Sequence, residues 1–175
     1  KCESPAAMPG FLFIEILTDR GLVVVVKIGD VVEIPTKLGL SYAHYTHRHA
    51  QYGDLLRVFS GSHVARPSNL HQIVEARPAF MCFFPLGAAV RKKIFSIAAN
   101  VAVPSSGQTF PVFRAGALNP ATGKVGTWWL WDGEKEWPIG GLTAEQRSLS
   151  IRGVWNDTYL INRIESGWTP ETDPT

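Results

Sequence analysis

Short apolar runs recur along the chain and are separated by glycines, prolines and small polar residues. The runs are rich in β-branched and aromatic residues, which pack well in strands. With 16 glycines and 12 prolines in 175 residues, the breaks are too frequent for long helices, and the pattern predicts a strand-rich domain with tight turns. The expected strands cover residues 11–17, 22–28, 31–34, 40–46, 55–59, 80–84, 94–98, 110–114 and 127–131, with hairpin turns at 18–21 and at Asp132-Gly133.

Three short segments begin with residues that cap helices. In one of them, Thr143 and Gln146 have the spacing of a capping box. The apolar run 83–90 is instead expected to be a core strand that leads into a turn. The expected helices are residues 69–76, capped by Ser68, residues 144–149, capped by Thr143, and residues 157–165, capped by Asp157.

These elements predict a single α+β domain: a strongly bent, mostly antiparallel β-sheet with a few short helices. The length of 175 residues fits one domain that buries a core of its own. We expect the domain to span residues 26–168, with residues 1–25 as an N-terminal extension that adds a hairpin or hangs loose. Residues 169–175 include two prolines and two acidic residues and are expected to be a frayed C-terminal tail.

Composition narrows the classes of protein. A hydrophobic share of 45% excludes general disorder, and a formal net charge of +2 is too small to suggest a nucleic-acid partner. No uninterrupted apolar stretch is long enough for a membrane span, and charged residues break the N-terminal apolar run, so we expect neither a membrane partner nor a secretory signal. Two cysteines, Cys2 and Cys82, do not make a disulfide framework, and Cys82 is expected to be a buried small hydrophobe. We therefore expect a cytoplasmic protein.

Three of the five histidines, His44, His47 and His49, lie within six residues. On a strand, His47 and His49 share one face and His44 points to the other. An H-x-H pair on one face suits a divalent metal ion such as Zn²⁺, but a third ligand must come from elsewhere in the chain. Asp54 is the third ligand of our prediction, with His63 and His71 as alternatives, and the other interpretation is a solvated polar strand without metal.

Four of the six tryptophans lie within residues 127–137. If residues 127–131 form a strand, Trp129 and Trp131 share one face and Trp128 takes the other. Large aromatic residues usually fill a core, but they also form the wall of an apolar pocket or a patch that binds a partner. With Trp155, Trp129 and Trp131 are the candidate substrate-binding residues.

Two carboxylates near these aromatic residues, Asp132 and Asp157, are the candidate catalytic residues. Asp157 follows Asn156 at the start of an expected helix, so its first interpretation is a helix cap, and the alternative is that one of the two orients a water molecule or a histidine. The sequence contains no phosphate-binding glycine loop, G-x-S-x-G elbow, H-E-x-x-H, paired C-x-x-C or EF-hand loop. Any catalysis therefore needs a less common site.

Four phrases, at residues 29–35, 83–89, 128–133 and 153–157, together resemble the bacterial immunity-protein-26-like family, which also contains the small HocA-type phosphotriesterases. The resemblance covers about residues 26–170. It implies one of two functions. One is hydrolysis of organophosphate triesters such as coroxon to a dialkyl phosphate and an aryl alcohol. The other is an immunity protein that binds and neutralises a bacterial polymorphic toxin without catalysis.

The resemblance supplies no catalytic residues, so the predicted site depends on chemistry. A neutral phosphotriester needs an activated water, a group that polarises the phosphoryl oxygen and an apolar pocket, and one divalent metal ion can supply the first two. The predicted enzyme holds that ion with His47, His49 and Asp54 and binds a small organophosphate. The alternative, a toxin-binding protein, needs only a rigid surface. The resemblance favours the phosphotriesterase, and the residues themselves fit both functions.

Overall fold

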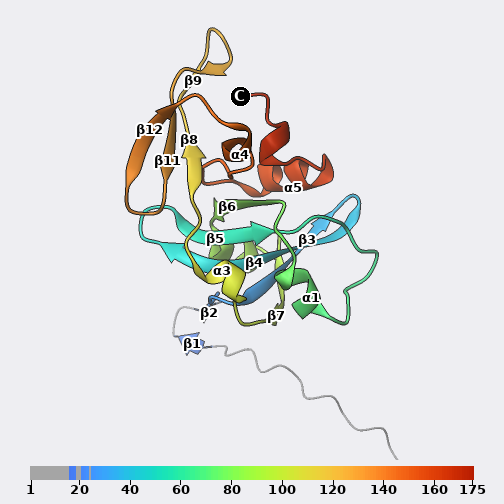
Figure 1. Cartoon of the computed structure of the whole chain (residues 1–175). Helices are drawn as coiled ribbons and strands as arrows, with labels where there is room; N and C mark the ends of the chain where they lie inside the picture. Colours follow the sequence, from blue (N-terminus) through green and yellow to red (C-terminus); the bar gives the residue numbers. More distant parts are fainter. Residues whose placement is uncertain (1–15, 19–20, 24) are drawn as a thin grey trace, which may run out of the picture.

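A five-stranded antiparallel sheet with the strand order β6-β5-β4-β3-β7 is the largest element of the fold (Figure 1). The structure is a computed structural model that describes residues 16–18, 21–23 and 25–175. Gly39 and Gly53 have positive φ values of 120° and 89° and allow the tight turns on either side of β4. The strands are β3 (Asp30–Thr36), β4 (Gly39–His49), β5 (Gly53–Val58), β6 (Phe80–Phe84) and β7 (Ser96–Asn100), which confirms five of the predicted strands with shifts of a few residues at their ends.

A second, three-stranded sheet with the order β12-β11-β8 lies beside the first one (Figure 1). An extended segment, residues 150–155, connects the two sheets. Its backbone bonds to β6, where Trp155 N donates to Phe83 O at 2.9 Å, and to β8, where Arg152 N donates to Arg114 O at 2.8 Å. The strands are β8 (Phe113–Ala115), β11 (Trp128–Trp131) and β12 (Glu136–Gly140). The predicted return of the chain after Asp132-Gly133 is therefore confirmed.

Two small hairpins complete the strands. The strands β1 (Ile16–Thr18) and β2 (Gly21–Val23) pair antiparallel, which confirms the N-terminal hairpin over the residues that the structure describes; the remainder of the expected strand 11–17 lies outside them. The expected strand 22–28 is wrong in its second half, because residues 25–28 belong to no strand. The second hairpin, β9 (Leu118–Asn119) and β10 (Lys124–Val125), was not predicted from the sequence.

The three predicted helices are present, and the capping residue differs in two of them. The helix α1 (Leu70–Glu75) is capped by Asn69 rather than Ser68, and α5 (Asp157–Glu165) is capped by Asn156, whose side chain accepts a bond from Tyr159 N at 2.8 Å. A capping oxygen must reach the N–H group three residues later, and a shift of one residue in the helix start moves the cap with it. The capping box at Thr143 is confirmed at the start of α4 (Ala144–Arg147).

The prediction of a strand followed by a turn over residues 83–90 is wrong in its second half. The strand β6 ends at Phe84, and after Pro85 the chain forms the helix α2 (Leu86–Arg91), which buries Leu86 and Ala89 against the sheet. Small apolar residues do not distinguish a buried helix from a buried strand. The short helices α3 (Ser105–Gln108) and η1 (Pro170–Thr172) were also not predicted. No helix in the described residues is long and apolar enough to cross a membrane.

The two faces of the five-stranded sheet pack against different elements. One face packs against α2 and α5, and its core includes Tyr45, Leu56 and Leu160. Cys82 belongs to this core and is fully buried, as predicted, and burial raises the pKa of its thiol. The other face carries two smaller apolar clusters, one around Tyr42 beside α1 and one that includes Leu55. The three histidines of β4 and Arg57 of β5, described below, lie on this second face.

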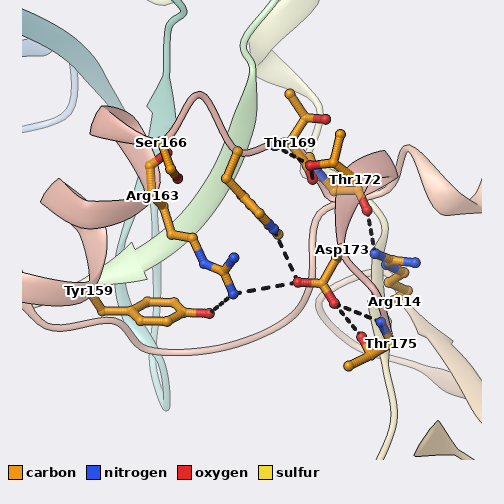
Figure 2. A network of polar contacts seen from close by, with 10 residues as sticks. Arg114, Tyr159, Arg163, Ser166, Thr169, Thr172, Asp173 and Thr175 are labelled. Atoms are coloured by element: carbon orange, nitrogen blue, oxygen red, sulfur yellow. Dashed lines mark hydrogen bonds and ion pairs between the residues drawn. The ribbon is translucent and has the colours of Figure 1, made fainter. Parts of the chain in front are cut away.

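The C-terminal segment packs on the domain, and the expectation of a frayed tail is wrong. Figure 2 shows the contacts around the buried Asp173. The Trp168 indole N–H donates to its carboxylate at 3.1 Å, and the guanidinium of Arg163 lies 3.5 Å from the same oxygen. The buried Arg114 donates to the carbonyl oxygen of Pro170 at 2.7 Å. These polar contacts offset the lack of apolar residues that suggested a frayed end.

Candidate functional site

A β-bulge in β4, just before His47, places all three histidines of this strand on one face of the sheet. His44 lies opposite Arg57 and His47 lies opposite Leu55, and these two β5 residues share a face because they are two positions apart. His49 follows His47 by two positions and takes the same face. The expectation that His44 points away from the other two histidines is therefore wrong, because the bulge shifts the alternation by one residue.

Each of these histidines bonds to the backbone of a segment that crosses this face. A carbonyl oxygen only accepts hydrogen bonds, so in all three imidazoles the Nε2 atom carries the proton. The three segments come from different parts of the chain, and the histidines fasten them to the sheet. The Nε2 partners are the carbonyl oxygens of Val101 for His44 (3.0 Å), Gln108 for His47 (2.9 Å) and Gly133 for His49 (3.1 Å).

The second ring nitrogen, Nδ1, is also bonded in two of the three imidazoles. In His49 it accepts from the backbone N–H groups of Gln51 and Tyr52, both at 3.2 Å. In His47 it lies 3.0 Å from the hydroxyl oxygen of Thr46. Only in His44 is Nδ1 buried without a partner, and burial lowers the pKa of this imidazole below its usual value. The lone pairs that a metal ion would need on His47 and His49 are thus already used.

Asp54, the predicted third metal ligand, lies on the opposite face of the sheet from His47 and His49. It pairs with Arg48 across the β4–β5 ladder, and its Oδ1 atom lies 3.9 Å from Arg48 Nε. Within the described part of the chain, no group of three or more His, Cys, Asp or Glu residues is placed to hold a metal ion. The predicted ligand set does not fit a metal ion in this arrangement, and we derive no step through one.

The three candidate substrate-binding tryptophans lie in different surroundings. Trp131 is buried beside His49, with ring centroids 5.1 Å apart. Trp155 is buried on the face that α5 covers, where its ring lies 5.2 Å from that of Phe80. Trp129, in contrast, is 38% exposed. The structure therefore joins one tryptophan to the histidines, places a second in the core behind the sheet and leaves the third open to solvent.

The two candidate catalytic carboxylates do not meet the histidines. Asp132 lies in the exposed turn between β11 and β12, where one carboxylate oxygen accepts from the backbone N–H groups of Lys135 at 2.7 Å and Glu134 at 2.9 Å. These two bonds, with that from Lys135 the larger cause, lower the pKa of Asp132. Asp157 begins α5, which packs on the face opposite the histidines. The carboxylate of Asp132 therefore stabilises its turn, and Asp157 lies in the first turn of α5 behind the cap Asn156.

Two functional candidates escaped the sequence analysis. One is Arg57, which is buried on the histidine face and lies in the apolar run 55–59; a charged residue inside such a run was the available signal. The other is Trp137, which is 37% exposed on β12. The sequence shows Trp137 only as part of the tryptophan-rich segment 127–137. Its exposure depends on the whole fold and cannot be read from that pattern.

The hairpin β11–β12 carries both exposed tryptophans at one edge of the three-stranded sheet (Figure 1). Trp129 lies opposite Pro138 and Trp137 lies opposite Leu130, so the two indoles take opposite faces of the hairpin. Comparisons of the chain with protein-family models, curated proteins and solved structures found no match. Function must therefore be argued from this geometry and from the chemistry of the residues themselves.

Proposed function

We propose that this chain acts by binding another protein, with the β11–β12 hairpin as its contact surface. The observation that carries the proposal is the exposure of Trp129 and Trp137, at 38% and 37%, on one hairpin at the edge of a sheet. Tryptophan is the residue most enriched among those that dominate binding energy at protein interfaces. The resemblance described above suggests a class of partner, a bacterial toxin protein.

The form of the hairpin favours contact through side chains. β12 is the outer strand, and such edges invite another strand to pair with them. Pro138 has no N–H group to offer an added strand, and Glu134, Lys135 and Glu136 place charges around the turn. A partner that covers the outer strand reaches the indoles of both faces. Single substitutions of Trp129 and Trp137 therefore test the two faces separately.

The state of the histidine face supports binding over catalysis. The imidazoles of His47 and His49 use both ring nitrogens in bonds to the chain, and the candidate carboxylates lie elsewhere. General acid–base catalysis needs a titratable group within hydrogen-bond reach of the substrate. A contact surface has no such requirement.

The experiment begins with a partner that the chain retains from a bacterial extract, identified by mass spectrometry, purified and titrated calorimetrically. We expect a stoichiometric complex in which Trp129→Ala and Trp137→Ala each weaken affinity about 30-fold or more, equivalent to about 2 kcal/mol. Tyr159→Ala, a change of another exposed aromatic residue on α5, is the matched control and should leave affinity unchanged. Equal affinities for all four proteins would reject the hairpin as the contact surface.

Phosphotriester hydrolysis is the second candidate, and one observation favours it. His47 and Arg57 line the same small cavity. A guanidinium can polarise a phosphoryl oxygen, and the His47 imidazole can take a proton from water only if its Nδ1 atom gives up the bond to the Thr46 hydroxyl group. The test is turnover of a diethyl aryl phosphate by purified protein, with and without added Zn²⁺. Saturable turnover that His47→Gln abolishes, while the fold is kept, would establish this candidate. Turnover at the rate of buffer would reject it.

A further inference from the structure

Arg57 is a buried cation without a counter-charge. Its side chain is on β5 and is 6% exposed, and its Nη1 atom has no hydrogen-bond partner. No carboxylate among the described residues forms an ion pair with it. Burial lowers the pKa of this guanidinium from its usual value, but an arginine in a protein stays charged. A charge that is buried and unpaired is strongly unfavourable, so the guanidinium of Arg57 favours a partner that the described residues do not provide.

A second buried arginine, Arg114, has a hydrogen-bond acceptor within the chain. Arg114 is also fully buried, and its Nε and Nη1 atoms have no partner, but its Nη2 atom donates to the carbonyl oxygen of Pro170 and its guanidinium lies over the ring of Trp128 at 4.9 Å, with the charge of Asp173 nearby. The C-terminal segment thus covers Arg114 (Figure 2). Arg57 Nη1 has no such hydrogen-bond acceptor, and its residue lines a small cavity.

That space is a cavity of about 50 Å³ beside the guanidinium. A water molecule needs roughly 10–15 Å³ of such volume, so the cavity has room for several waters or one small ion. Thr46, His47, Ser106 and Thr109 are among the residues that line it, and no acidic residue lines it. Its donors and its single positive charge are the features of a site for an anion.

Gly107 leaves room for the guanidinium of Arg57 in its present position. A Cβ atom built on Gly107 would lie 2.0 Å from Arg57 Nη1, closer than atoms can approach without displacement. Any other residue at this position would push the guanidinium aside. The backbone of the segment before Phe110 therefore approaches Arg57 as closely as glycine allows, and it closes the cavity from above the sheet.

We propose that this cavity binds a small oxyanion of the size of phosphate or sulfate, held by the guanidinium of Arg57 and by the hydroxyl groups of Ser106 and Thr109. A guanidinium presents several N–H donors in a plane, which matches two oxygens of such an anion. The site lies on the five-stranded sheet and uses neither Trp129 nor Trp137, so it does not depend on the proposed protein contact.

The test is the melting temperature of the purified full chain in phosphate, sulfate and chloride at equal ionic strength. An anion that binds only the folded state raises the melting temperature by about 5–10 °C at 100 times its dissociation constant. We expect this rise with phosphate or sulfate for the wild-type chain. Arg57→Met should lose it and should melt at or above the wild-type temperature in chloride, because it removes an unpaired buried charge.

Two further variants make the result decisive. Gly107→Ala keeps the charge of Arg57 but displaces its guanidinium from its present position, so it should also lose the anion-dependent rise. Arg91→Gln removes an exposed arginine on α2 and should keep the full rise. Phosphate and sulfate also stabilise proteins without binding, by exclusion from the surface, and that effect is common to all the variants. Equal rises for the wild-type chain, Arg57→Met and Gly107→Ala would overturn the proposal.

Discussion

The histidine face of the five-stranded sheet and the β11–β12 hairpin both stand out in the sequence, yet they differ in what they leave available. On β4, the imidazoles of His47 and His49 have both ring nitrogens bonded to the chain. On the hairpin, Trp129 and Trp137 expose more than a third of their surface. The imidazole nitrogens of His47 and His49 are thus already hydrogen-bonded, whereas the indoles of Trp129 and Trp137 are exposed to solvent. This difference is the reason for proposing binding as the function.

Within the hairpin itself, the strand β11 carries one buried and one exposed tryptophan. Trp131 is 5% exposed and packs among Phe83, Phe113 and His49, whereas Trp129, two positions away on β11, is open. The two residues were equivalent by sequence pattern, because alternation places them on one face. Position within the sheet separates them: the end of β11 that carries Trp131 lies over the aromatic cluster.

The largest expected effect is on the stability of the Trp131→Ala variant. Removing this buried indole should lower the free energy of unfolding by about 3–5 kcal/mol, because a cavity forms in the aromatic cluster. Trp129→Ala is the matched control and should cost about 1 kcal/mol or less. Urea unfolding monitored by circular dichroism measures both. Similar losses in the two variants would show that Trp129 is part of the core and would remove it from the contact surface.

A smaller effect is expected for the histidines that fasten the crossing segments. His49→Ala should cost about 1–3 kcal/mol in the free energy of unfolding, because it leaves the Gly133 carbonyl and two backbone N–H groups without their partner. His71→Ala, at an exposed position on α1, should cost about 0.5 kcal/mol or less. A chelator should leave the melting temperature of the wild-type chain unchanged. A fall of the melting temperature on chelation would restore the metal-site hypothesis.

The smallest effect concerns pH and His44. Burial lowers the pKa of this imidazole below its value of 6.5 in an unfolded chain. The unfolded state therefore binds a proton first as pH falls, and stability is lost below about pH 6.5, with a slope of at most about 1.4 kcal/mol per pH unit from this one group. Unfolding in urea between pH 7 and pH 5 measures this slope. His44→Gln, which cannot titrate, should reduce it, and an unchanged slope would contradict the assignment.

Local signals in the sequence were sufficient for most of the fold. The β-branched and aromatic runs in β3 to β5 and the capping box at Thr143 extend over a few residues, so a pattern reveals them. The helix α2 was missed because its residues are small and apolar, and only the preceding Pro85 marks the change.

The site was less predictable because it depends on contacts between distant segments. The bulge in β4 inverts the alternation after His44, and no residue type announces it. The carbonyl oxygens that occupy the histidines belong to residues 101, 108 and 133, far along the chain. The exposure of Trp129 and the isolation of Arg57 likewise follow from which segments cover them and which do not.

Amide hydrogen exchange of the chain, alone and bound to its purified protein partner, tests the central claim most directly because it measures both regions at once. We predict slower exchange on binding in residues 128–140, which form the hairpin, and unchanged exchange in residues 44–49 of the histidine face. Protection confined to residues 44–49 and the segment around Gly107, with an unaffected hairpin, would contradict the account and would place the function on the histidine face.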